Sequence, residues 1–126
     1  MTDLSKYHQT TLGLLRIAIG LVFLNFGLAK IFHFAAGDYT PPIGSLSWIA
    51  GLIELVGGAL LLVGFKTRIV AFVLSGLMAC AYFIAHFPVS IFPTINGGAA
   101  AAVFAFVCLN FVTAGAGRFS VDGMRN

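Results

Sequence analysis

Apolar residues fill four long segments of this chain, and short polar or turn-rich stretches separate them. The segments cover residues 11–34, 46–65, 69–87 and 98–114. Each is close to the roughly 20 residues that a helix needs to cross the ~30 Å hydrocarbon core of a bilayer. The pattern predicts an all-α, polytopic membrane protein built as a bundle of four transmembrane helices.

The breaks between the segments have the chemistry of loops. Residues 37–42 contain a glycine and two prolines, 64–68 begin with a glycine, and 88–98 contain two prolines and an Asn-Gly pair. Proline and glycine end helices, so each break is predicted to be a connection. The chain is therefore expected to form one domain over residues 1–126.

The composition excludes a soluble domain. Hydrophobic residues make up 60% of the chain and charged residues 9%, whereas a soluble domain carries about 25% charged residues. The net charge of +3 comes from basic residues that are scattered at the predicted helix ends. They form no phosphate-binding patch, so we expect a lipid bilayer as the surroundings and no nucleic-acid partner.

The distribution of basic residues predicts the orientation. Lys66 and Arg68 lie between the second and third segments, Arg118 and Arg125 lie in the tail, and Lys6 precedes the first segment. The first and third connections carry no lysine or arginine. Because positive residues favour the cytoplasmic side, both termini are predicted to be cytoplasmic.

Charged residues inside the apolar segments lie on the predicted packing faces. On the first segment, Arg16 and Lys30 project within roughly 40° of one direction together with Gly20 and Gly27. Such small residues allow helices to approach closely, so this glycine-lined face is expected to pack inside the bundle. Ionisable residues in membranes are normally found facing inward in this way.

Glu54 is the single charged residue within 46–65. A carboxylate at this depth costs about 2.5–3.5 kcal/mol on insertion scales, so it needs a partner. Lys30 lies about 6 Å and Glu54 about 12 Å below the same membrane surface, while Arg16 lies nearer the other surface. We therefore predict a Lys30–Glu54 ion pair.

A polar pocket is expected around this pair. His86, at the end of the third segment, and Asn96 are predicted to join it, and His33 and Asn25 are further candidates. Lys30 and Glu54 are candidate catalytic residues, because a quinone needs hydrogen-bond donors at its carbonyls and a proton source. The alternative is that the pair only holds two helices together.

Other polar residues allow weaker hypotheses. Arg16 and Arg68 are candidate ligand-binding residues, although Arg68 is also explained as a topology anchor. His33 and His86 are a conceivable haem pair, but histidines at helix ends are more often interfacial residues. Cys80 and Cys108 have no metal-binding spacing and are expected to be core residues, and no metal site is predicted.

The order and spacing of several segments resemble the DoxX family of small four-helix membrane proteins. The resemblance covers most of the chain and rests on residues 15–17 with Gly20, 27–30, 51–58, Gly64 with 67–68, His86, 96–98 and 117–122. It implies a multi-pass protein of a bacterial-type plasma (inner) membrane. One position departs from the family pattern, which is often acidic after Asn-Gly-Gly, where this chain has Ala99.

The resemblance implies quinone-linked redox chemistry, since the family takes its name from a subunit of a thiosulfate:quinone oxidoreductase. The chain has no iron–sulfur cysteine set and no nucleotide-binding glycine motif, so electrons would come from a partner oxidoreductase. A non-catalytic scaffold that recruits a soluble oxidoreductase is the alternative, and a small-solute transporter is a third hypothesis. A homo-oligomer is compatible with each of them.

Overall fold

The computed structural model describes residues 3–34, 36–37 and 40–124. Every secondary-structure element in this part of the chain is helical. In chain order the elements are η1 (Ser5–Tyr7), α1 (His8–Phe32), α2 (Leu46–Val63), α3 (Thr67–Ala81), the π-helix η2 (Tyr82–His86), α4 (Pro93–Asn96), α5 (Ala99–Ala114) and α6 (Val121–Met124). Arg125, one of the basic residues that predict the orientation, lies outside the described residues.

Three of the four predicted spans are confirmed as helices long and apolar enough to cross a membrane. They are α1 with η1, α2, and α3 continued by η2. The fourth apolar segment forms α5, which has 16 residues and is shorter than the other three. The all-helical fold with three helices that could span a membrane is therefore confirmed, and the crossing by α5 stays a prediction.

Two of the predicted segments end two residues earlier than the sequence pattern indicates. The first segment was expected to reach residue 34, but α1 ends at Phe32 because His33 adopts a left-handed backbone with φ 60°. The second was expected to reach residue 65, but α2 ends at Val63 because Gly64 adopts φ 73°. A left-handed residue closes a helix by redirecting the chain, and hydrophobicity alone does not reveal where it lies.

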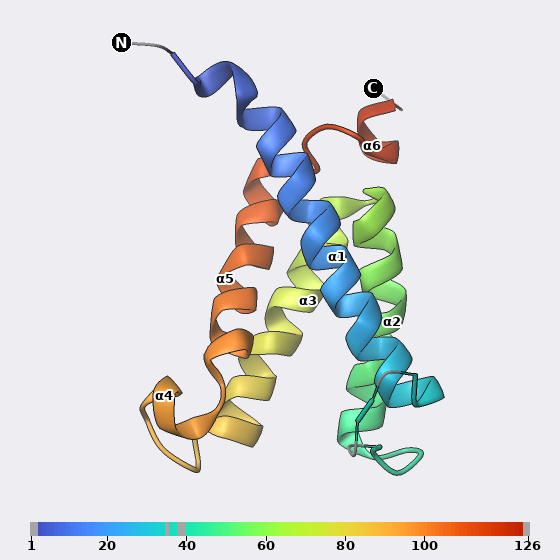
Figure 1. Ribbon diagram of the computed structural model, residues 1–126, viewed down its shortest axis with the longest axis vertical. Coiled ribbons are helices and arrows are strands. Elements are labelled where there is room, and N and C mark those ends of the chain that lie inside the picture. Colours follow the sequence, from blue (N-terminus) through green and yellow to red (C-terminus); the bar gives the residue numbers. More distant parts are fainter. Residues whose placement is uncertain (1–2, 35, 38–39, 125–126) are drawn as a thin grey trace.

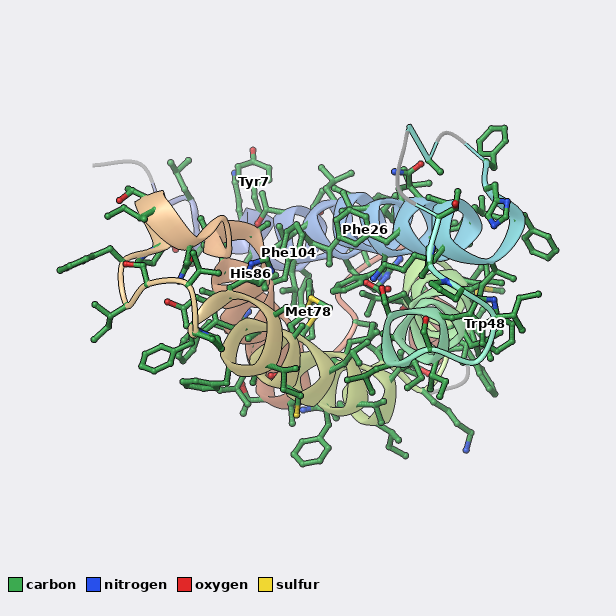
Figure 2. The ribbon with its side chains drawn as sticks, turned by 90° about the horizontal axis from the view of Figure 1, so that it is seen from below. Tyr7, Phe26, Trp48, Met78, His86 and Phe104 are labelled. Atoms are coloured by element: carbon green, nitrogen blue, oxygen red, sulfur yellow. The ribbon has the colours of Figure 1, made fainter. Side chains whose placement is uncertain are left out.

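The helices form two antiparallel pairs (Figure 1). Helix α1 packs along α2, and α3 packs along α5. We call the end of the bundle that carries α4 the α4 end, and the end that carries the N-terminus and α6 the α6 end. Between the pairs, Phe26 of α1 and Phe104 of α5 face one another with ring centroids 6.2 Å apart (Figure 2).

Helices α1 and α2 touch backbone to backbone. A Cβ atom added to Gly20 would lie 2.7 Å from the backbone nitrogen of Leu62, and one added to Gly58 would lie 2.5 Å from that of Leu24. Gly27 faces the backbone of Leu55 in the same way. The glycine-lined face of α1 is thus a packing seam, as the sequence predicts.

The chain that follows α5 is tied to the α6 end by Arg16, whose side chain is fully buried. Its Nε donates to the carbonyl oxygen of Leu61 at 2.9 Å. Its Nη1 donates to those of Ala116 at 2.5 Å and Arg118 at 2.9 Å, and its Nη2 donates to that of Phe119 at 2.7 Å. Arg16 therefore joins α1, α2 and the tail at one point.

A second contact fixes the tail to the start of α3. The Asp122 carboxylate accepts the backbone N–H groups of Lys66 and Thr67, each at 2.8 Å. The first N–H groups of a helix lack partners inside the helix and carry partial positive charge, so a carboxylate stabilises this end. The polar tail is thus part of the folded bundle.

The glycine seam is tested by adding a methyl group to it, with a glycine of α3 as the control. Gly58→Ala places a Cβ against the α1 backbone and should lower the free energy of unfolding by about 1–3 kcal/mol. Gly76→Ala, in α3, has nothing within 4 Å of the new Cβ and should leave stability unchanged or raise it. Thermal unfolding in detergent, followed by circular dichroism, measures both. Equal effects of the two variants would contradict the seam.

The role of Arg16 is tested by removing its guanidinium. Arg16→Met leaves several buried carbonyl oxygens without donors and should cost about 3 kcal/mol or more. It should also speed amide hydrogen exchange over residues 116–122. Arg118→Met is the control, because that side chain is exposed and Arg118 offers Arg16 its backbone carbonyl. Unchanged exchange over 116–122 in Arg16→Met would disprove this anchoring.

Candidate functional site

Lys30 and Glu54 form the predicted ion pair. Lys30 Nζ lies 2.7 Å from Glu54 Oε1, and this bond joins the last turns of α1 to the middle of α2. Gly51, one turn before Glu54, makes room for the lysine, since a Cβ on it would lie 2.6 Å from Lys30 Cβ. The close helix packing thus brings the ammonium group within hydrogen-bond distance of the carboxylate.

The two partners differ in exposure. The Glu54 side chain is 1% exposed, whereas that of Lys30 is 23% exposed. An ammonium group has three donors, and Glu54 is its hydrogen-bond partner within the described residues. Lys30 therefore keeps donors for other acceptors, while its bond to Glu54 fixes the position of the ammonium group.

Lys30 opens onto a pocket of about 440 Å³ at the α4 end of the bundle, between α2 and the α3–η2 helix. Its polar lining consists of Lys30, Ser47, Cys80 and His86. The rest of the lining is apolar: Leu46, Ile49, Ala50, Ile53, Leu77, Ala81, Ile84 and Ala85. A largely apolar pocket with a few polar groups is typical of a small-molecule site.

His86 lies at the end of η2 and is oriented by the loop before α5. Its Nδ1 lies 3.0 Å from the carbonyl oxygen of Asn96. A carbonyl only accepts hydrogen bonds, so Nδ1 carries the proton and the Nε2 of a neutral ring is an acceptor. One side of the pocket thus offers a cationic donor and another side a histidine with a defined tautomer.

Asn96 supports the pocket from behind. It is 6% exposed and does not line the cavity. Its Nδ2 donates to the Tyr82 hydroxyl at 3.1 Å, and its Oδ1 accepts the backbone N–H of Gly98 at 2.7 Å. The predicted ligand-binding residue Asn96 is therefore placed next to His86, as a residue that holds η2 against the start of α5.

Arg16 and Arg68 lie at the α6 end, away from the Lys30–Glu54 pair. The Arg68 Nη1 donates to the carbonyl oxygens of Val112 at 2.9 Å and Thr113 at 2.6 Å, in the last turn of α5. Arg68 also borders a more polar pocket of about 650 Å³ at that end. The structure does not bring these two arginines into one site with Lys30.

Two further candidates do not join the pocket. His33 is the exposed residue that ends α1, and Asn25 is exposed on the side of α1 that faces away from α2. Neither lines the cavity. The prediction that they extend the polar pocket is therefore wrong. His33 lies where the chain leaves α1, and Asn25 projects from the side of α1 opposite its inward, glycine-lined face.

The two cysteines are free and have different surroundings. Cys108 is fully buried in the core, as predicted, whereas Cys80 is exposed and lines the pocket. The signal for Cys80 is its spacing, since 77, 80, 81, 84 and 85 lie on one helical face of the third segment. Within the described residues, no three His, Cys, Asp or Glu side chains gather as a metal site requires.

Comparisons with known proteins identify the family of the chain. The family model named DoxX matches residues 11–87, from α1 to just beyond η2. An uncharacterized protein of Haemophilus influenzae is 37% identical over 134 positions, which cover 97% of this chain and 96% of that protein. No solved structure matches the chain. The matched region contains the glycine seam, Lys30, Glu54 and His86, and the chain belongs to the DoxX family of membrane proteins.

Proposed function

We propose that this protein is the membrane subunit of a quinone-linked redox system and that the pocket at the α4 end binds the quinone headgroup. The observation that carries the proposal is the environment of the Lys30 side chain. Its ammonium group is held by a buried carboxylate, keeps donors beyond that bond, and borders a largely apolar cavity of about 440 Å³. A quinone ring is apolar on its faces and presents carbonyl oxygens at its edges, which matches this lining.

The pocket supplies complementary groups for both redox forms. Lys30 donates to one quinone carbonyl oxygen, which gains electron density when the ring is reduced. The conversion of quinone to quinol takes up two electrons and two protons. In this proposal both protons come from bulk water at the pocket mouth, one by way of the Nε2 of His86 and the other by way of the Lys30–Glu54 pair. Neutral His86 accepts the hydrogen bond of a quinol hydroxyl, and protonated His86 donates to a quinone carbonyl.

The electrons come from a partner oxidoreductase in this proposal, since the sequence has no redox-carrier motif. Arg68 and Arg118 are both exposed at the α6 end, which gives a soluble partner with an acidic surface a place to dock. This basic face also suits the alternative function, a non-catalytic scaffold. The two functions differ in whether the pocket at the α4 end binds a ligand.

The membrane topology belongs to the same proposal. We infer that α5 is the fourth span and that both termini are cytoplasmic. The α6 end carries Lys66, Arg68 and Arg118, whereas the described connections at the α4 end carry no lysine or arginine. The quinone pocket then lies in the outer half of a bacterial-type inner membrane.

Trp48 provides a direct test of quinone binding. It is the single tryptophan, and its neighbours Ser47 and Ile49 line the pocket. A short-chain benzoquinone should quench its fluorescence in a saturable way. Lys30→Met should weaken binding about tenfold or more, because hydrogen bonds to charged groups contribute about 1.5–3 kcal/mol. Ala85→Phe should also weaken binding, by filling the cavity while leaving every polar group in place.

Lys66→Met is the matched control for that titration, because it removes one positive charge at the α6 end. It should bind the quinone with unchanged affinity. If the affinities of Lys30→Met and Ala85→Phe both equal that of the parent protein, the pocket is not the quinone site. If the quinone quenches the Trp48 fluorescence of neither the parent protein nor any variant, the scaffold function is favoured.

The topology is tested by labelling with a membrane-impermeant maleimide. In a Cys80→Ala, Cys108→Ala background, Gly37→Cys should react from the outer side of intact cells. Gly123→Cys should react only after the membrane is opened. Labelling of both from outside would place α5 on the membrane without crossing it. The opposite labelling pattern would reverse the orientation.

A further inference from the structure

The outward side of α1 carries a seven-residue repeat that the bundle does not use. At 100° per residue, six positions project within roughly 40° of one direction, about 120° away from that of Gly20. We call these positions the α1 stripe, and they are Leu14, Ala18, Leu21, Asn25, Leu28 and Phe32. Leucine occupies every position of the repeat that starts at Leu14, and Asn25 is the central residue of the other.

Most of the α1 stripe faces away from the rest of the bundle, although Leu28 within it is half-buried. Leu14 is 55% exposed, Leu21 is 51% exposed and Phe32 is 67% exposed. Asn25 is exposed as well. Since α1 is long and apolar enough to cross a membrane, this side meets either lipid or another protein.

Asn25 distinguishes the α1 stripe from an ordinary lipid-facing surface. Its side-chain amide has no hydrogen-bond partner within the described residues. It lies seven residues before the end of α1, or about 10 Å along the helix, which puts it inside a hydrocarbon layer ~30 Å thick. Acyl chains offer an amide neither donor nor acceptor, so exposure to lipid leaves it unsatisfied at a substantial cost.

We propose that a second copy of this chain covers the α1 stripe and forms a parallel, two-fold symmetric dimer in which the two Asn25 amides hydrogen-bond to each other. An amide both donates and accepts, so it is complementary to its own symmetry mate. Two copies inserted in the same orientation hold Asn25 at the same depth. A second copy also presents the same leucine repeat, so the two stripes match along their length.

The repeat itself has the form of a two-stranded helix pair. Apolar residues at alternating spacings of four and three form a seam along which two helices cross at about +20°, as membrane helices commonly do. A single asparagine within such a seam fixes the register and favours a pair of helices. The α1 stripe has this pattern from Leu14 to Phe32.

The other exposed asparagine of the spans does not compete with this assignment. Asn110 lies four residues before the end of α5, or about 6 Å along the helix, where a side chain reaches the interface. It lies among Phe106, Val103 and other apolar residues without a seven-residue leucine repeat. The pocket at the α4 end is lined by α2, α3 and η2 together with Lys30, so a dimer through the α1 stripe leaves it open.

The test measures dimer dissociation in liposomes by energy transfer between separately labelled copies of the full chain. Asn25→Leu should raise the dissociation constant about tenfold, the effect of losing an interhelical amide bond in a membrane. Asn25→Gln, which keeps the amide, should stay within about threefold of the parent. Asn110→Leu is the matched control and should not change the dissociation constant. A monomeric parent, or Asn25→Leu that dimerises as tightly as the parent, overturns the proposal.

Cross-linking checks the geometry independently. In the Cys80→Ala, Cys108→Ala background, oxidation should link Leu21→Cys to its counterpart in a second copy. Phe72→Cys, which is exposed on α3, should not link at the same protein density. Equal yields at the two positions would show random collision, and efficient linking through Phe72→Cys alone would move the interface to α3. Both positions face outward, so neither substitution disturbs the core.

Discussion

The close contact between α1 and α2 is the constraint on which the rest of the structure depends. Gly20, Gly27 and Gly58 let the two backbones meet without intervening side chains. Because α1 cannot move away from α2, the two cations on its inward face must find partners there. Lys30 meets Glu54 toward the α4 end, and Arg16 meets the last carbonyl groups of α2 at the α6 end. One seam therefore positions both the candidate site and the anchor of the tail.

Much of this arrangement is readable from residue spacing, because helical angle and depth follow from geometry alone. That reasoning gives the three long apolar helices, the seam and the Lys30–Glu54 pair. The same angles place Asn25 about 140° from Gly20, which argues against the pocket to which it was assigned. The partners of Arg16 were not predictable, since they are backbone carbonyls of the tail and carry no side-chain signal. The Asp122 cap on α3 depends likewise on how the tail folds back.

The two cations on the inward face of α1 are satisfied in different ways. The guanidinium of Arg16 is planar and has five N–H donors, and carbonyl oxygens from α2 and the tail surround it. Such carbonyls are neutral dipoles that come from backbone already fixed in the fold, so this site is complete without a ligand. Lys30 instead has one carboxylate partner and a compact ammonium group with three donors.

This contrast bears on whether the Lys30–Glu54 pair only holds two helices together. Unfilled donors in a membrane are costly, so a purely structural cation is expected to have its donors filled by the protein, as those of Arg16 are. Lys30 keeps donors at the edge of a cavity that reaches His86, and Asn96 holds the tautomer of that histidine. A structural pair requires neither the cavity nor the oriented imidazole. An acceptor that entered the pocket would satisfy the donors of Lys30, which supports the proposed ligand site over a structural pair.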